Sequence, residues 1–154
     1  MKTIFLTLFL FAVSKYTIAQ EASLGINYFP NGMFDSNNMR VEAGYYLGEP
    51  VKYGAFLRAN DDFKELSCGL GLSTSILKLG ECCELNLTTA IGFEFEQQEA
   101  TRFDTDYHRN YAEIGASVVY EISENYFIKQ TFCKQYYGQA PTTYFGAAVV
   151  YKLK

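Results

Sequence analysis

The chain has 154 residues, of which 49% are hydrophobic and 17% aromatic, with 13 Tyr, 13 Phe and no Trp, and its formal net charge is −4. This length is typical of a single domain, and an acidic chain without a basic cluster is a poor nucleic-acid binder. We therefore expect no nucleic-acid partner, and the aromatic-rich composition favours β-strands.

Residues 1–19 have the pattern of a secretory signal peptide. Lys2 precedes an apolar run over Ile4–Val13, and the small-residue stretch Thr17–Ala19 follows as a cleavage site. The run is about half of the ~20 residues that a membrane-spanning helix needs. We expect export and cleavage, which remove Lys2 and Lys15 and leave a domain of residues 20–154 with 11 Lys and Arg, 17 Asp and Glu and a net charge of −6.

The mature chain is predicted to form eight β-strands, because apolar and polar residues alternate with period two along eight segments. The segments have 8 to 15 residues, comparable with the roughly 9 to 11 residues of a tilted membrane-spanning strand, and no apolar run is long enough for a membrane-spanning helix. The seventh is the weakest, since Gln130 and Lys134 share the apolar face with Ile128 and Phe132. In chain order the segments are Ala22–Phe29, Arg40–Leu47, Val51–Ala59, Leu66–Leu79, Cys82–Glu96, Asn110–Ile122, Tyr126–Tyr137 and Thr143–Leu153.

The connections between these strands alternate in length. In order they read PNGMFDSNNM, GEP, NDDFKE, GE, QQEATRFDTDYHR, SEN and GQAPT, so every second connection is a tight turn. A membrane barrel with both termini on one side has short periplasmic turns and longer extracellular loops. We expect the odd-numbered connections to be extracellular, including the loops Pro30–Asn38 and Gln97–Arg109.

Register across two of the turns gives an independent check, because residues paired in an antiparallel hairpin point to the same side. Around Gly48–Pro50, the apolar residues of both strands fall on one face, with Glu42, Lys52 and Arg58 on the other. Around the Gly80–Glu81 turn, six pairs share the apolar face: Ile76 with Leu85, Thr74 with Leu87, Leu72 with Thr89, Leu70 with Ile91, Cys68 with Phe93, and Leu66 with Phe95.

The orientation of the two faces separates two classes of barrel. In a soluble lipocalin-like or avidin-like barrel the apolar face would surround a small hydrophobic ligand, whereas in a membrane barrel it would face lipid. A polar face rich in Gly and Ser suits a narrow lumen and favours the membrane barrel. So do aromatics near strand ends, where interfacial girdles lie: Tyr28, Phe29, Tyr45, Tyr46, Phe93, Phe95, Tyr111, Tyr136, Tyr137, Tyr144 and Phe145.

Charged residues of both signs on the polar face predict a paired network inside the lumen, because a buried charge needs a partner or solvent. We expect this lumen network to contain Glu42, Lys52, Arg58, Glu94, Glu96, Glu113, Glu121 and Lys129. The predicted fold class is therefore all-β, an eight-stranded antiparallel up-and-down transmembrane β-barrel.

The signal peptide, the eight alternating strands, the loop pattern and the final strand TYFGAAVVYKLK together resemble the small outer-membrane β-barrels of the OmpA and OmpX type. The final strand alternates apolar residues from Phe145 to Leu153 and closes with Lys154, where that group usually ends in an aromatic. The resemblance implies a Gram-negative outer-membrane location, folding by the barrel-assembly machinery, and contact with outer-membrane lipid and lipopolysaccharide.

Function is expected to reside in the extracellular loops, as a structural, adhesive or surface-interaction role. The candidate loop contacts are Phe34, Asp35, Arg102, Asp104, Asp106 and His108, with a partner that the residues do not identify. A lipid A-modifying barrel enzyme centred on His108 is an alternative, but no Ser or Glu lies at a triad spacing. We expect no catalysis, no cofactor and no metal site.

The four cysteines are Cys68, Cys82, Cys83 and Cys133. An exported chain invites disulfides. In a simple strand meander, however, no unstrained intrachain pair is obvious, because a bridge requires Cα atoms within ~7 Å. Cys68 and Cys83 lie near opposite ends of one hairpin, Cys82 points to the other face, and Cys133 lies on a strand that does not neighbour theirs. We expect them to act as small apolar residues.

Overall fold

A computed structural model of the chain describes residues 20–30, 39–60, 63, 65–96, 107–138 and 140–153, with the side chains at 96, 107, 108 and 140 left undescribed. The expected signal peptide lies outside these ranges. Within them, no helix has both the length and the apolar character needed to cross a membrane.

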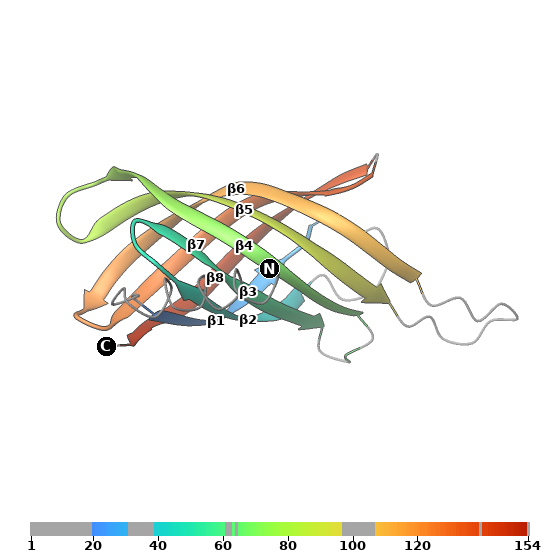
Figure 1. The fold of residues 1–154 in the computed structure, drawn as a ribbon, viewed down its shortest axis with the longest axis horizontal. Coiled ribbons are helices and arrows are strands. Elements are labelled where there is room, and N and C mark those ends of the chain that lie inside the picture. The colour runs from blue at the N-terminus through green and yellow to red at the C-terminus, as the bar shows by residue number, and fades with distance from the viewer. Residues whose placement is uncertain are drawn as a thin grey trace, which may run out of the picture.

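Eight antiparallel strands form a closed barrel in which each strand pairs with the next along the chain and β8 pairs with β1 (Figure 1). The predicted up-and-down architecture is confirmed. The strands are β1 (Gln20–Tyr28), β2 (Met39–Leu47), β3 (Val51–Asn60), β4 (Glu65–Lys78), β5 (Cys83–Glu96), β6 (Tyr107–Ser123), β7 (Tyr126–Tyr137) and β8 (Ala140–Leu153).

The two ends of the barrel differ. The β2–β3, β4–β5 and β6–β7 turns lie at the left in Figure 1 with the start of β1 and the end of β8, and we call this the terminal end. The opposite, loop end carries the β1–β2, β3–β4, β5–β6 and β7–β8 connections. The last of these is shorter than predicted, because Tyr137 pairs with Ala140 and Tyr136 with Pro141. Pro141 lies beyond the β1–β8 pairing, so its missing N–H costs no ladder bond on that side.

The predicted β4–β5 register is confirmed for five of the six pairs, from Leu66 with Phe95 to Thr74 with Leu87. The sixth, Ile76 with Leu85, is wrong. An irregularity between Ser75 and Leu77 inserts one extra residue into β4, so Leu77 pairs with Leu85 instead. A β-bulge of this kind changes the facing of every residue beyond it.

The register also fixes the stagger of the barrel. A row of paired residues that starts at Glu84 on β5 passes once around all eight strands and returns to β5 at Glu94, ten residues farther along. Such a stagger tilts the strands relative to the barrel axis, and eight strands leave an interior that side chains can fill.

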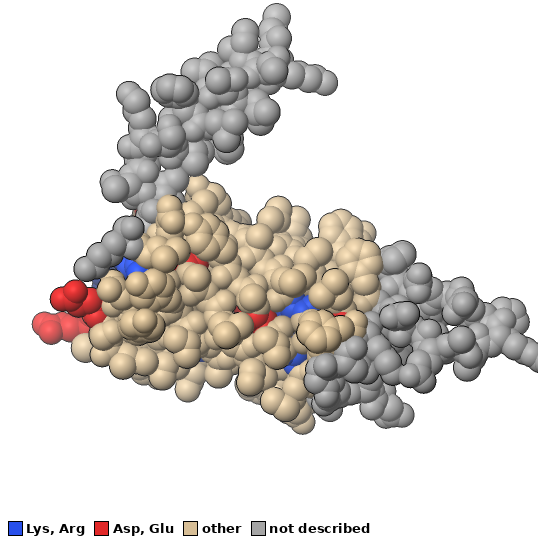
Figure 2. Space-filling view, turned by 90° about the horizontal axis from the view of Figure 1, so that it is seen from below, with Lys and Arg blue, Asp and Glu red and all other residues tan. Residues whose placement is uncertain are grey.

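The outer wall is apolar. Leu24, Leu70 and Ile91 each expose more than 60% of their surface, and uncharged side chains cover most of the face drawn in Figure 2. Among the described strand side chains that point outward, only Lys134 is charged, and its Nζ lies 5.6 Å from the centre of the Tyr136 ring near the loop end. This is the orientation of a membrane barrel and the reverse of the one that a soluble ligand-binding barrel requires.

The prediction that the aromatic residues near strand ends all form girdles is wrong for five of them. Neighbouring aromatics such as Tyr45 and Tyr46 lie on opposite faces, because side chains alternate along a strand. Phe29, Tyr46, Tyr111, Tyr137 and Tyr144 turn inward and are buried or half-buried. The outward aromatics do form two belts, with Tyr45, Tyr53, Tyr120, Tyr126 and Tyr151 at the terminal end and Tyr28, Phe93, Phe95 and Tyr136 at the loop end.

Inward glycines provide the space that the inward rings occupy. A Cβ atom at Gly92 would lie 2.5 Å from the Tyr111 ring and 2.6 Å from the carbonyl oxygen of Cys68, and one at Gly69 would lie 2.6 Å from the Phe56 ring. Small residues therefore lie beside large ones on neighbouring strands, as a narrow barrel requires.

Gly92→Ala should destabilise the barrel by about 1–3 kcal/mol, because the added methyl group forces Tyr111 or the β4 backbone to move. The measurement is urea unfolding of the protein in lipid vesicles. Ala112→Val, which adds volume to the outward face of β6, is the matched control and should leave the midpoint nearly unchanged. Equal midpoints for Gly92→Ala and the parent would contradict the packing described here.

Candidate functional site

The centre of the lumen is closed by Arg58, whose side chain is only 3% exposed. Its Nε donates to Glu42 Oε2 at 2.5 Å, and its two terminal nitrogens bind both carboxylate oxygens of Glu113. Tyr144 accepts from Arg58 at 2.8 Å and donates to Glu113 at 2.9 Å. Strands β2, β3, β6 and β8 thus meet at one guanidinium, the fork geometry that favours arginine over lysine in such pairs.

A second arginine organises the loop end of the lumen. Arg40 on β2 forms ion pairs with Glu65 at 2.9 Å and with Glu94 at 2.6 Å. Tyr137 donates a further hydrogen bond to Glu94 at 2.6 Å, and the Phe29 ring lies 4.5 Å from the Arg40 guanidinium carbon. The lumen at the loop end is therefore filled by charged and aromatic side chains.

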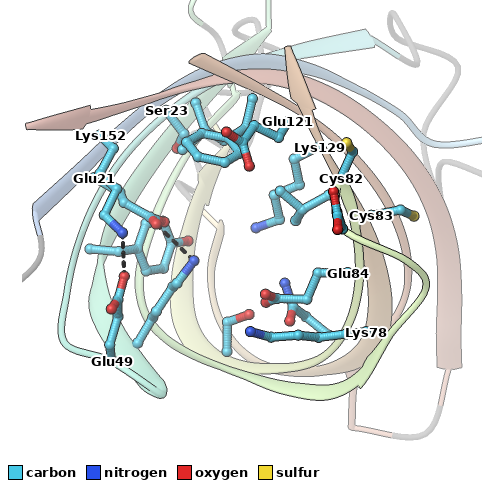
Figure 3. Close-up of a pocket in the computed structure, with 18 of the residues that line it drawn as sticks. Glu21, Ser23, Glu49, Lys78, Cys82, Cys83, Glu84, Glu121, Lys129 and Lys152 are labelled. Carbon is cyan, nitrogen blue, oxygen red and sulfur yellow. Dashed lines mark hydrogen bonds and ion pairs between the residues drawn. The ribbon is translucent and has the colours of Figure 1, made fainter. Parts of the chain in front are cut away.

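At the terminal end the lumen opens into a cavity of about 200 Å³, which we call the vestibule (Figure 3). Its walls carry two ion pairs, Lys52 with Glu21 at 2.7 Å and Lys152 with Glu49 at 2.5 Å. The hydrogen bond that Lys152 donates lowers the pKa of the Glu49 carboxyl, which lies in the exposed β2–β3 turn. Lys129 points into the cavity from β7. The two ends of the lumen thus differ, one packed and one hollow.

One row of paired residues connects the vestibule with the packed end. From the mouth it runs through Glu84, Lys129, Glu42, Arg58, Glu94 and Arg109, separated only by small or apolar residues and serines. The sign of the charge alternates along the whole row. Opposite charges at neighbouring positions allow a narrow interior to hold this many ionised groups.

The structure places the predicted lumen residues as follows. Glu42, Lys52, Arg58, Glu94, Glu113 and Lys129 all line the lumen, and all but Lys52 and Lys129 belong to the two arginine-centred networks. Glu121 lies at the mouth of the vestibule, where its side chain is exposed. The side chain of Glu96 is outside the described residues, although its backbone ends β5.

The predicted loop contacts Phe34, Asp35, Arg102, Asp104 and Asp106 lie outside the described residues. His108 differs from the expectation of a loop residue, because its backbone belongs to β6 and pairs with Phe95. Continued pairing with β5 extends β6 past the predicted start at Asn110. Among the described residues, no group of three or more His, Cys, Asp or Glu side chains could hold a metal ion.

Several lumen residues were missed by the sequence prediction of the network. The alternation that places Glu42 on the polar face also places Arg40 there, but Arg40 is not in the predicted network, and Glu21 and Glu65 fall just outside the predicted strand limits. The inward tyrosines were assigned to the girdles. Strict alternation from Tyr45 would have placed Tyr46 inside, so the signal was present in the sequence.

All four cysteines are free. Cys133 is buried in the lumen wall, 3.4 Å from the Thr88 hydroxyl, whereas Cys82 is exposed at the β4–β5 turn. Cys133 therefore has the environment of a packed small residue.

The sequence matches no protein-family model and no curated protein sequence. Solved structures with a similar fold include the N-terminal β-barrel domain of Pseudomonas aeruginosa OprF, with a TM-score of 0.74 and 13% identity over 88% of this chain and 97% of that one. Neisserial surface protein A matches with a TM-score of 0.64 and 11% identity over 88% and 96% of the two chains. Ail, the attachment invasion locus protein of Yersinia pestis, matches with a TM-score of 0.51 and 9% identity over 88% and 96%.

Each similar chain is matched over nearly its whole length, so the similarity covers the complete barrel. The polar lumen, the apolar wall and these matches agree. The chain has the fold of the small eight-stranded outer-membrane β-barrels.

Proposed function

We propose that the protein is an outer-membrane β-barrel, exported with a cleaved signal peptide, which acts at the cell surface through its β1–β2 and β5–β6 loops. The observation that carries the proposal is the apolar outer wall, with Lys134 as the one charged outward strand residue among the described side chains. Such a wall is stable in lipid and would aggregate in water. Outer-membrane lipid and lipopolysaccharide are then its surroundings, and the barrel-assembly machinery its folding partner.

The packed lumen favours a protein that acts by surface contact and argues against a wide pore. Arg58, Glu42, Glu113 and Tyr144 close the centre, and only a cavity of about 30 Å³ lies beside them. Eight-stranded barrels generally have interiors that side chains fill. An adhesive role is supported by the fold shared with the attachment invasion locus protein and by the expected length of the two loops. The proposal assigns no catalytic activity.

The location and orientation can be tested with epitope tags. A tag inserted after Phe103, in the β5–β6 loop, should bind antibody on intact cells, because that loop is expected outside. A tag inserted between Glu124 and Asn125, in the β6–β7 turn, should bind only after the outer membrane is permeabilised. The reverse pattern would overturn the orientation, and recovery of the mature chain in the soluble periplasmic fraction would overturn the membrane location.

The adhesive role predicts that replacement of residues 98–106 by a Gly-Ser segment of equal length abolishes attachment of expressing cells to host-cell or extracellular-matrix surfaces. The barrel should still fold, since the described strand pairing ends at Glu96 and Tyr107. Shuffling the same nine residues without changing their composition is the matched control for loop charge. Undiminished attachment by the Gly-Ser variant, with normal surface display, would remove this loop from the proposal.

The Arg58 network predicts that Arg58→Ala lowers the free energy of unfolding much more than Lys152→Ala does. Arg58→Ala should lower the free energy of unfolding by about 3–5 kcal/mol, because it leaves Glu42 and Glu113 buried without their shared cation. Lys152→Ala removes a solvent-exposed ion pair with Glu49 and should cost only about 0–1 kcal/mol. Both are measured by denaturant unfolding in lipid vesicles, and similar losses for the two variants would contradict the central role of Arg58.

A further inference from the structure

The vestibule contains a buried polar atom that has no partner among the described residues. Asn86 on β5 is 2% exposed, lines the vestibule, and its Oδ1 atom accepts no hydrogen bond. A buried acceptor left unsatisfied costs free energy comparable to its desolvation, so such an atom calls for a donor. Asn86 therefore leaves unused hydrogen-bonding capacity in the cavity wall, although its Oδ1 atom is itself buried behind the cavity surface.

The side chain of Lys129 places a positive charge in the vestibule. It projects from β7 into the cavity (Figure 3), and its Nζ lies 5.4 Å from the centre of the Tyr46 ring. Lys129 lies near Glu42 and Glu21 but forms no ion pair with either within the described part of the chain, since Glu42 is held by Arg58 and Asn27, and Glu21 by Lys52. An ammonium group in this position can bind an anionic oxygen.

The mouth of the cavity has the opposite charge. Glu81 and Glu84 border it at the β4–β5 turn and Glu121 borders it on β6, whereas Lys78 is the one lysine there beyond the Lys52 and Lys152 ion pairs. Acidic side chains are also seen at the terminal end of the surface in Figure 2. The vestibule is therefore basic at its inner end and acidic at its mouth.

We propose that the vestibule binds a small zwitterion, with its anionic oxygens on Lys129 and its ammonium group toward the carboxylates at the mouth. A volume of about 200 Å³ corresponds to roughly six or seven water molecules, which suits a molecule of about that many non-hydrogen atoms. Free α-amino acids and the phosphoethanolamine group of lipids share this chemistry. The site lies at the end opposite the loops, so the inference is independent of the proposed surface role.

The test is isothermal titration calorimetry on the full mature chain, folded in a non-ionic detergent and an amine-free buffer. The probes are glycine and O-phosphoethanolamine as zwitterions, with acetate as the anion alone and ethylammonium as the cation alone. We expect saturable binding of at least one zwitterion, tighter than that of either single-charge probe. Glycine binding identifies the amino-acid class, and phosphoethanolamine binding identifies the headgroup class.

Lys129→Met should weaken zwitterion binding about 10- to 100-fold, since it removes a charge-assisted hydrogen bond. Lys134→Met is the matched control, because it removes a lysine from the outer face of the same strand and should bind as the parent does. Folding of both variants is checked by the heat-dependent shift in gel mobility. The proposal is overturned if neither zwitterion binds, if acetate binds as tightly as the zwitterions, or if folded Lys129→Met retains full affinity.

Discussion

Closure of the sheet is the constraint on which the rest of the structure depends. Pairing of β1 with β8 removes the free edges that an open sheet would present. The ten-residue stagger of the register fixes the tilt of the strands relative to the barrel axis. Because side chains alternate along each strand, a shift of one residue in any pairing would exchange lipid-facing and lumen-facing residues. The register is therefore what keeps aliphatic side chains outside and charged side chains inside.

The narrow lumen that follows from closure determines its own composition. Rings such as Tyr111 and Phe56 fit only because Gly92 and Gly69 face them. Ionised groups are tolerated because two guanidinium groups are each shared between two carboxylates, Glu42 and Glu113 for Arg58, and Glu65 and Glu94 for Arg40. Packing and charge pairing thus act together: the glycine–ring contacts join neighbouring strands, and the ion pairs of Arg40 and Arg58 also reach strands that are not neighbours in the sheet.

The two ends of the lumen are filled unequally, so the barrel has two chemically different ends. The loop end is filled by the contacting side chains of Arg40, Phe29, Glu94 and Tyr137. The terminal end is hollow and presents polar groups to the side on which β1 begins and β8 ends. Surface contact and ligand binding would then occupy opposite ends of one rigid wall.

The sequence by itself determined the eight strands, their faces and most of one hairpin register, because these depend on period-two alternation and short turns, which are local. It did not determine the bulge at Ile76, because Ile76, Leu77 and Leu79 are all apolar and the period-two alternation does not show which residue is the extra one. The partners of the lumen charges also came only from the tertiary structure. Arg40 meets Glu94 across 54 positions and Arg58 meets Glu113 across 55, distances along the chain that only the closed barrel brings together.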